Sequence, residues 1–148
     1  MAIVLRKATA RDLSAITGLS LQLYGGRHDA DELEAENRRL LRMRSQVVFL
    51  ALRDGCAVGF AHGSIRTDYV EGTSSGRVGY LEGVYVQPEA RRCGVAARLL
   101  GLCEDWARQR GCREFASDCL LANSGSIHFH QKTGFMEANR IVCWTKKL

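Results

Sequence analysis

One stretch, residues 80–101, restricts the possible folds more than any other part of the chain. It reads YLEGVYVQPEARRCGVAARLLG, which is an apolar extended run, a basic turn with a glycine, and a helix in immediate succession. Apolar residues then recur at steps of three and four, which predicts one buried helical stripe. The stripe consists of Val95, Leu99, Leu102, Cys103 and Trp106. Gly111 is placed to end this helix.

The turn between this strand and helix is suited to receive an anion. The first N–H groups of a helix have no partner within it and lie at the positive end of the helix dipole. Gly94 and Ala96 keep the surface low enough for a phosphate to reach these groups, and Arg91 and Arg92 add positive charge. A plain strand-to-helix turn with solvated arginines has the same pattern, so both interpretations stay open.

The composition fits one soluble domain over residues 1–148. A chain of 148 residues buries about two thirds of its unfolded surface. The longest apolar run, residues 47–52, is far too short to cross a membrane, and Met1 leads into a strand-like segment without a signal-peptide core. We therefore expect a cytoplasmic protein with no membrane partner.

Cysteine usage and charge exclude several function classes. The six cysteines lack paired spacing, so we expect free thiols. His128 and His130 stand two apart and diverge on a helix, so we expect no metal. The net charge of +5 raises the possibility of a nucleic-acid partner. Because the basic residues fall in short groups without interleaved aromatic residues, we expect no nucleic acid.

The remaining elements fill out a mixed α/β fold. Hairpin turns make the middle of the chain an antiparallel meander, and a right-handed crossover makes the strand after the central helix parallel to the central strand. We expect a helix from a Thr9 cap to Gly25-Gly26, and a substrate-covering loop at residues 24–29. Expected strands span residues 2–7, 46–52, 56–65, 81–86, 114–119 and 141–145; further helices span 29–44, 95–110 and 124–132.

Two carboxylates stand out in this arrangement. Glu82 lies inside an apolar strand, where an unpaired carboxylate is costly, and beside Gly83 it is placed to face a cleft and hold a cationic amine. Its ordinary pKa of ~4.3 makes it a poor direct base, which favours electrostatic positioning with proton relay. Asp118 ends the neighbouring strand and is expected near the same cleft. The alternatives are a rim glutamate paired with a surface arginine, and an aspartate that caps a loop.

The element order and the spacing Arg-x-x-Gly-x-Ala at residues 91–96 resemble the GNAT superfamily of N-acetyltransferases. The resemblance covers essentially the whole chain. It implies the GNAT acyl-CoA N-acyltransferase fold, a mixed, mostly antiparallel sheet with a central parallel strand pair flanked by helices. It also implies acetyl-CoA as co-substrate. The cofactor contacts that it implies are Val84, Val86, Arg91, Arg92, Gly94, Val95, Ala96 and Asn123.

One position departs from the superfamily pattern. Superfamily members often carry, four residues before the glycine that corresponds to Gly134, a tyrosine that protonates the leaving thiolate; His130 stands there in this chain. A histidine with an ordinary pKa near ~6.5 can donate that proton. It can equally be a helix-face residue that contacts CoA or water.

Four segments together narrow the resemblance to the aminoglycoside 6′-N-acetyltransferases, specifically the small dimeric enzymes of that group. They are residues 59–61, 64–72, 80–86 and 111–118. The resemblance implies that Glu82 and Asp118 line the acceptor pocket, with Tyr24 and Tyr69 near the sugar rings, and it implies a homodimer. Asn139 stands where some relatives carry an acid, with Glu137 nearby, so the range of aminoglycosides stays open.

We therefore predict transfer of acetyl from acetyl-CoA to the 6′-amine of an aminoglycoside by direct attack in a ternary complex, which confers resistance. No cysteine is marked as an acyl carrier. Glu82, Asp118 and His130 are the predicted catalytic residues, and the N–H of Val84 is expected to polarise the thioester carbonyl. The alternatives are a GNAT enzyme that acetylates a protein N-terminus, a lysine or a polyamine, and a CoA-binding module without catalysis.

Overall fold

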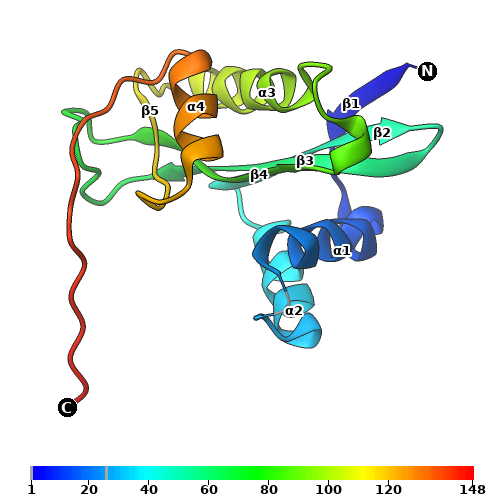
Figure 1. The fold of residues 1–148 in the computed structure, drawn as a ribbon, viewed down its shortest axis with the longest axis horizontal. Coiled ribbons are helices and arrows are strands. Elements are labelled where there is room, and N and C mark those ends of the chain that lie inside the picture. The colour runs from blue at the N-terminus through cyan, green and yellow to red at the C-terminus, as the bar shows by residue number, and fades with distance from the viewer. Residues whose placement is uncertain (1, 26) are drawn as a thin grey trace.

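A single five-stranded sheet organises the computed structural model, which describes residues 2–25 and 27–148. Figure 1 shows helices α1 and α2 on one face of this sheet and α3 and α4 on the other. The strand order along the sheet is the order along the chain. The strands are β1 (Ile3–Lys7), β2 (Gln46–Arg53), β3 (Cys56–Arg66), β4 (Val78–Val86) and β5 (Phe115–Ser117).

The pairing of the strands confirms the predicted meander and the predicted parallel pair. Strands β1 to β4 are antiparallel neighbours, and β5 runs parallel to β4 over residues 79–81. Strand β5 is shorter than the expected 114–119. Because it stands at the end of the strand order, the parallel pair lies at the edge of the sheet in the described part of the chain.

Side chains cap the 3₁₀ turn before α1 and the start of α2, whereas α3 begins without a side-chain cap from the described residues. Thr9 and Asp12 form the predicted capping box before a 3₁₀ turn and α1. The side chain of Asp29 accepts the N–H of Asp31 at the start of α2, which ends at residue 40 and not at 44. Gly26, expected to help end α1, lies outside the described residues. The helices are α1 (Leu13–Tyr24), α2 (Ala30–Leu40), α3 (Val95–Gln109) and α4 (Ser124–Lys132).

The main core lies between α3 and the sheet. The predicted stripe on α3 is buried against β3 and β4, except that Leu102 is half-buried while Leu100 is fully buried. Packing is close at Gly79, where an added Cβ would lie 2.7 Å from the Cβ of Ala107 and 2.5 Å from the ring of Phe115. This contact fixes α3 and β5 against β4. A smaller cluster that includes Ile16, Leu19 and Phe60 fixes α1 on the other face.

The prediction of a final strand at residues 141–145 is wrong, because the single chain forms no strand there. Figure 1 shows the C-terminal segment running away from the body of the protein, and it has no strand assignment. Val142 is 73% exposed and Trp144 is 86% exposed. The β-branched and aromatic residues there favour an extended chain, but a strand also needs a neighbouring edge, and this segment leaves the sheet.

No helix in the described ranges 2–25 and 27–148 is both long enough and apolar enough to cross a membrane.

Candidate active site

Strands β4 and β5 separate at the residue where β4 contains a bulge. Gly63 of β3 pairs with Leu81 and His62 pairs with Gly83, so Glu82 is an extra residue without a partner in the register. Leu81 is also the last residue of β4 that pairs with β5. From Glu82 to Val86, β4 therefore has no strand along its second edge in the described part of the chain.

The bulge also decides which backbone groups face this opened edge. The N–H of Gly79 donates to Glu114 on the β5 side, whereas the N–H of Gln87 donates to Val58 on β3. Backbone groups alternate between the two edges of a strand, so those of Val84 and Val86 face away from β3. The carbonyl of Val86 accepts a hydrogen bond from the Nε of Arg91 at 2.7 Å. Among the described side chains, none donates a hydrogen bond to the carbonyl of Val84, the other residue of the predicted pair.

The turn into α3 leaves the first amides of the helix accessible. Gly94, with φ of 71°, is the N-cap of α3, and no side chain of the described residues caps this helix start. Arg92 also has a left-handed backbone, with φ of 66°. Val95 is buried and Ala96 half-buried, so both offer backbone N–H groups and not side chains to a ligand. This geometry fits the predicted pyrophosphate cradle.

The two arginines of the turn differ in whether the protein holds their guanidinium groups in place. Arg92 is exposed, whereas the guanidinium of Arg91 is held by Val86 and lies 5.6 Å from the ring centre of Tyr85. A depression of about 450 Å³ beside the turn is lined partly by Arg53 and Arg98, which the sequence analysis did not select. The sequence gives little indication that these two arginines lie together, because Arg53 belongs to β2 and Arg98 to α3.

Both oxygens of the half-buried Glu82 carboxylate accept hydrogen bonds. Arg66 donates from Nη2 at 2.7 Å and from Nε at 3.0 Å, and the hydroxyl of Ser64 donates at 2.6 Å. Burial acts to raise the pKa of Glu82, but the hydrogen bonds from Arg66 and Ser64 outweigh it and hold the pKa below its ordinary value. The carboxylate is therefore ionised and serves better as an anchor for a cation than as a base.

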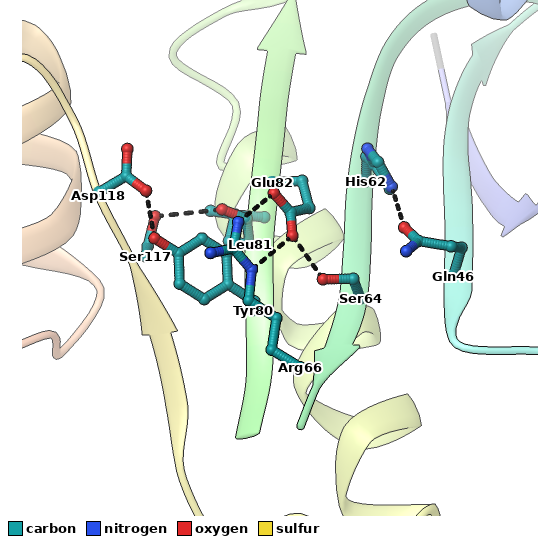
Figure 2. A network of polar contacts seen from close by, with 9 residues as sticks. All are labelled: Gln46, His62, Ser64, Arg66, Tyr80, Leu81, Glu82, Ser117 and Asp118. Atoms are coloured by element: carbon teal, nitrogen blue, oxygen red, sulfur yellow. Dashed lines mark hydrogen bonds and ion pairs between the residues drawn. The ribbon is translucent and has the colours of Figure 1, made fainter. Parts of the chain in front are cut away.

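Asp118 joins the same cluster through two further residues. The hydroxyl of Tyr80 donates to Oδ2 of Asp118, and the guanidinium carbon of Arg66 lies 3.5 Å from the centre of the Tyr80 ring. Figure 2 shows Glu82 and Asp118 connected in this way at the place where β4 and β5 separate. The predicted convergence of the two acids is present, with Arg66 and Tyr80 between them.

A half-buried histidine lies near Glu82. His62 Nε2 is 2.6 Å from Oε1 of Gln46 (Figure 2). Burial lowers the pKa of His62, and the nearby charge of Glu82 opposes this shift only in part. Sequence reasoning missed His62, Arg66 and Tyr80, because only the register of β3 on β4 brings them next to the acids.

Tyr24 approaches the opened strand from the end of α1. A Cβ on Gly83 would lie 3.5 Å from the Tyr24 hydroxyl, which places this hydroxyl in van der Waals reach of the strand. Burial, followed by the charge of Glu82, raises the pKa of Tyr24. The rings of Tyr24 and His28 are 5.0 Å apart. Tyr24, the first residue of the expected covering loop, therefore lies near Glu82.

The other predicted acceptor contacts form a separate surface group. Tyr69 is 81% exposed and donates its hydroxyl to Glu71, which also accepts from Nδ2 of Asn139 at 3.0 Å. Glu137 forms an ion pair with Arg140 at 2.9 Å. Within the described residues, no hydrogen bond or ion pair joins this group to Glu82 or Asp118. The structure thus brings Tyr69 and Asn139 together but leaves them apart from the acid cluster.

His130 lies near the separation of the strands, on the side of α4. Its Nδ1 is 2.6 Å from the carbonyl of Ser126, so Nδ1 carries a proton, and its Nε2 is 2.8 Å from the hydroxyl of Ser117. That hydroxyl is also 3.3 Å from the carbonyl of Leu81. Asn123 uses its side-chain oxygen to cap α4. Among the described residues, no group of three or more His, Cys, Asp or Glu side chains could hold a metal ion.

This geometry matches a known family along most of the chain. The model of the acetyltransferase (GNAT) family matches residues 13–135. The chain belongs to the GNAT family. Within the GNAT fold, the uncapped turn at Gly94 and the opened edge of β4 are the parts of this chain that fit an acyl-CoA.

Several relatives of this GNAT protein have the same name. An aminoglycoside N(6')-acetyltransferase type 1 from Salmonella typhimurium is 38% identical over 143 residues, which are 97% of this chain and 98% of that protein. A protein of the same name from Klebsiella aerogenes is 44% identical over 121 residues, 82% of this chain and 78% of that protein. The solved structure of AAC(6')-Iy with the bisubstrate analogue CoA-S-monomethyl-acetylneamine has a TM-score of 0.94 at 37% identity and covers 100% of both chains.

Proposed function

We propose that this GNAT protein transfers the acetyl group of acetyl-CoA to the 6′-amine of an aminoglycoside and thereby confers resistance. One observation carries the proposal: two carboxylates, Glu82 and Asp118, are linked through Arg66 and Tyr80 where β4 separates from β5, and the same strand leads into an uncapped helix start. An acidic site suits a polycationic acceptor, and the helix start suits a pyrophosphate. The name that the Salmonella and Klebsiella relatives share supports the same acceptor.

The chain's own groups provide binding and orientation on the cofactor side. The amides that follow Gly94 hold the pyrophosphate, and the opened edge of β4 holds the pantetheine arm. The N–H of Val84 donates to the thioester oxygen as negative charge develops on it. Acetyl-CoA supplies the activated acetyl group. Holding both reactants in line provides a large part of the rate, because it replaces an encounter of two molecules by a reaction within one complex.

The acids act on the acceptor side. Glu82, kept ionised by Arg66, anchors a cationic amine, and Asp118 with water receives the proton that the ammonium must lose. The free amine attacks the thioester carbon and the new C–N bond forms; the C–S bond then breaks, and the nitrogen releases its second proton to water. His130 lies near the point where β4 and β5 separate. We propose that it donates the proton that the leaving thiolate takes up.

We also propose that the protein is a cytoplasmic homodimer. The C-terminal segment exposes Ile141, Val142 and Trp144, an apolar surface that favours coverage by a second copy. The outer edge of β5 has no strand partner in the described chain, which gives a second copy an edge to pair with. The described cysteines are free thiols, as expected for a reducing compartment that also supplies acetyl-CoA.

Thiol release from acetyl-CoA with a panel of amines tests the acceptor. We expect turnover of aminoglycosides that carry a 6′-amine and none of analogues that carry a 6′-hydroxyl, with the modified nitrogen identified by NMR of the product. Peptides with free N-termini and linear polyamines are the comparison group. Faster turnover of a peptide or a polyamine than of every aminoglycoside would overturn the proposal in favour of another amine acceptor.

A further inference from the structure

We propose that Tyr80 is a positioning residue that sets the distance between the two acceptor-binding carboxylates. The inference rests on the proposed function, because it assigns a role in binding the amine. Tyr80 is buried in β4, two residues before Glu82, and its side chain contacts both Arg66, the partner of Glu82, and Asp118 itself. Its ring serves one acid and its hydroxyl serves the other.

The ring of Tyr80 acts on Glu82 through Arg66. The guanidinium carbon of Arg66 lies 3.5 Å from the ring centre, a stacking that holds the planar group in place. Held there, Arg66 presents Nε and Nη2 to the two oxygens of Glu82 at 3.0 and 2.7 Å. A planar guanidinium that is fixed on one face and bonded along one edge leaves the carboxylate a single orientation.

The hydroxyl of Tyr80 acts on Asp118 directly. It donates to Oδ2, which leaves Oδ1 of this exposed carboxylate available for an incoming ammonium group. The two carboxylates differ in their charge balance as a result. Arg66 offsets the charge of Glu82, whereas the neutral hydroxyl of Tyr80 orients Asp118 without offsetting its charge.

The two carboxylates therefore have different roles in binding the acceptor. A polycationic acceptor meets its strongest attraction at Asp118, and its second contact at Glu82 stands at a distance that Tyr80 fixes. A side chain that merely filled the core would supply the ring alone. The hydroxyl is therefore the part of Tyr80 that separates positioning from packing.

A double-mutant cycle on the full-length protein tests this role. Tyr80→Phe keeps the ring and removes the hydroxyl, and we expect it to raise KM for the aminoglycoside about tenfold, the effect of one hydrogen bond to a charged group. KM for acetyl-CoA should stay within about twofold of the wild-type value. Asp118→Asn should cost less in the Tyr80→Phe background than in the wild type, because a carboxylate that has lost the hydroxyl of Tyr80 is no longer oriented toward the amine, although its charge remains.

Tyr85→Phe is the matched control. Tyr85 lies on the same strand and its hydroxyl also donates to a side chain, Gln22, at 3.2 Å, outside the acid cluster. It should leave both KM values unchanged. Thermal melts of all variants separate a loss of folding from a loss of binding, and Tyr80→Trp, which keeps an aromatic face without the hydroxyl, repeats the test if Tyr80→Phe unfolds.

Two results would overturn the proposal: Tyr80→Phe behaving like Tyr85→Phe, or Tyr80→Phe and Asp118→Asn having independent effects that multiply. The proposed function fails separately, if the wild-type protein turns over peptide or polyamine amines and no aminoglycoside. The double-mutant cycle is then measured with the peptide or polyamine as acceptor, and the same two results would overturn the role of Tyr80.

Discussion

The Nε of Arg91 donates to the carbonyl oxygen of Val86 at 2.7 Å and so closes the turn that leads from β4 into α3. One side chain thus fixes the end of the opened strand relative to the helix start that follows it. Its positive charge is held at the end of β4, three residues before Gly94, the N-cap of the uncapped helix start.

Replacement of Arg91 tests this link. Arg91→Ala removes both the clamp and the charge, and we expect KM for acetyl-CoA to rise by about tenfold to a hundredfold, with KM for the aminoglycoside nearly unchanged. Initial-rate kinetics with each substrate varied in turn measure the effect. Arg11→Ala, at an exposed position before α1, controls for the loss of one charge. An equal rise in both KM values would contradict a role confined to the cofactor.

Gly94 should be sensitive for two reasons. Its φ of 71° makes Gly94→Ala strained by about 1 kcal/mol, and the added methyl group lies at the proposed pyrophosphate cradle. Gly111→Ala is the matched control, because Gly111 also has a left-handed backbone, with φ of 84°, but lies at the other end of α3. Thermal melts should show similar losses of stability for both variants. Only Gly94→Ala should raise KM for acetyl-CoA; the same rise in Gly111→Ala would show that strain alone is responsible.

The two acids should affect the acceptor and not the cofactor. We expect Glu82→Ala and Asp118→Ala each to raise KM for the aminoglycoside by at least about tenfold, since each removes a charged contact. KM for acetyl-CoA should change little. Equal effects on both substrates would remove these residues from the acceptor pocket.

The pH dependence of acceptor binding follows from the environment of Glu82. Its pKa is lowered, so the carboxylate stays ionised until the pH falls below the ordinary range of a glutamate, about 4.3. Titration of Glu82 should therefore produce no inflection in KM for the aminoglycoside between pH 8 and about 5. Arg66→Met removes the hydrogen bonds that lower the pKa and should move an inflection upward into the measured range. An unchanged pH profile in Arg66→Met would contradict this account.

Asp12 offers a pH test of the fold itself. Hydrogen bonds from Arg6 lower the pKa of Asp12 to about 2, and the N–H of Thr9 adds to them against a smaller opposing effect of burial. A lowered pKa stabilises the folded state above the unfolded pKa near 4, and the effect is lost as the pH falls toward 2. Urea unfolding should show Asp12→Asn about 1 kcal/mol less stable at pH 7, with the difference shrinking below pH 4. A difference independent of pH would assign the effect to packing.

The C-terminal segment tests the proposed assembly. Light scattering on the full chain should give the mass of a dimer, and deletion of residues 137–148 should give a monomer, because it removes the exposed apolar residues 141, 142 and 144. Replacement of Lys146 and Lys147 by alanine, in the same segment, should leave the dimer intact. A full-length monomer at micromolar concentration would refute the homodimer.

Most of the fold could be predicted because local patterns and long-range packing agree. The strand, turn and helix around Gly94 combine an apolar run, a glycine with a left-handed backbone and a helical stripe, and each points to the same structure. Residues 141–145 show where this reasoning stops. Their composition favours a strand, yet whether a strand forms depends on an edge that this chain does not supply to itself.

The acid cluster shows a second limit. Glu82 and Asp118 could be selected from the sequence because a carboxylate in or after an apolar strand is unusual. Arg66 stands 16 residues before Glu82, and the bulge at Glu82 changes the register between them. A shift of one residue exchanges the two faces of a strand, so Arg66 and Tyr80 could not be assigned to this cluster from periodicity alone.

If acetyl-CoA binds along β4 as proposed, the separation of β4 from β5 after Leu81 couples the stability of the protein to a metabolite. Backbone groups along an uncovered strand edge hydrogen-bond to water until another amide-bearing chain lies beside them. The pantetheine arm of CoA contains two amides, so it can act as a short additional strand and complete the sheet. Every tenfold excess of acetyl-CoA over its Kd then adds about 1.4 kcal/mol to the free energy of unfolding. The protein would accordingly be more stable against unfolding in a cell with abundant acetyl-CoA than in a cell with little of it.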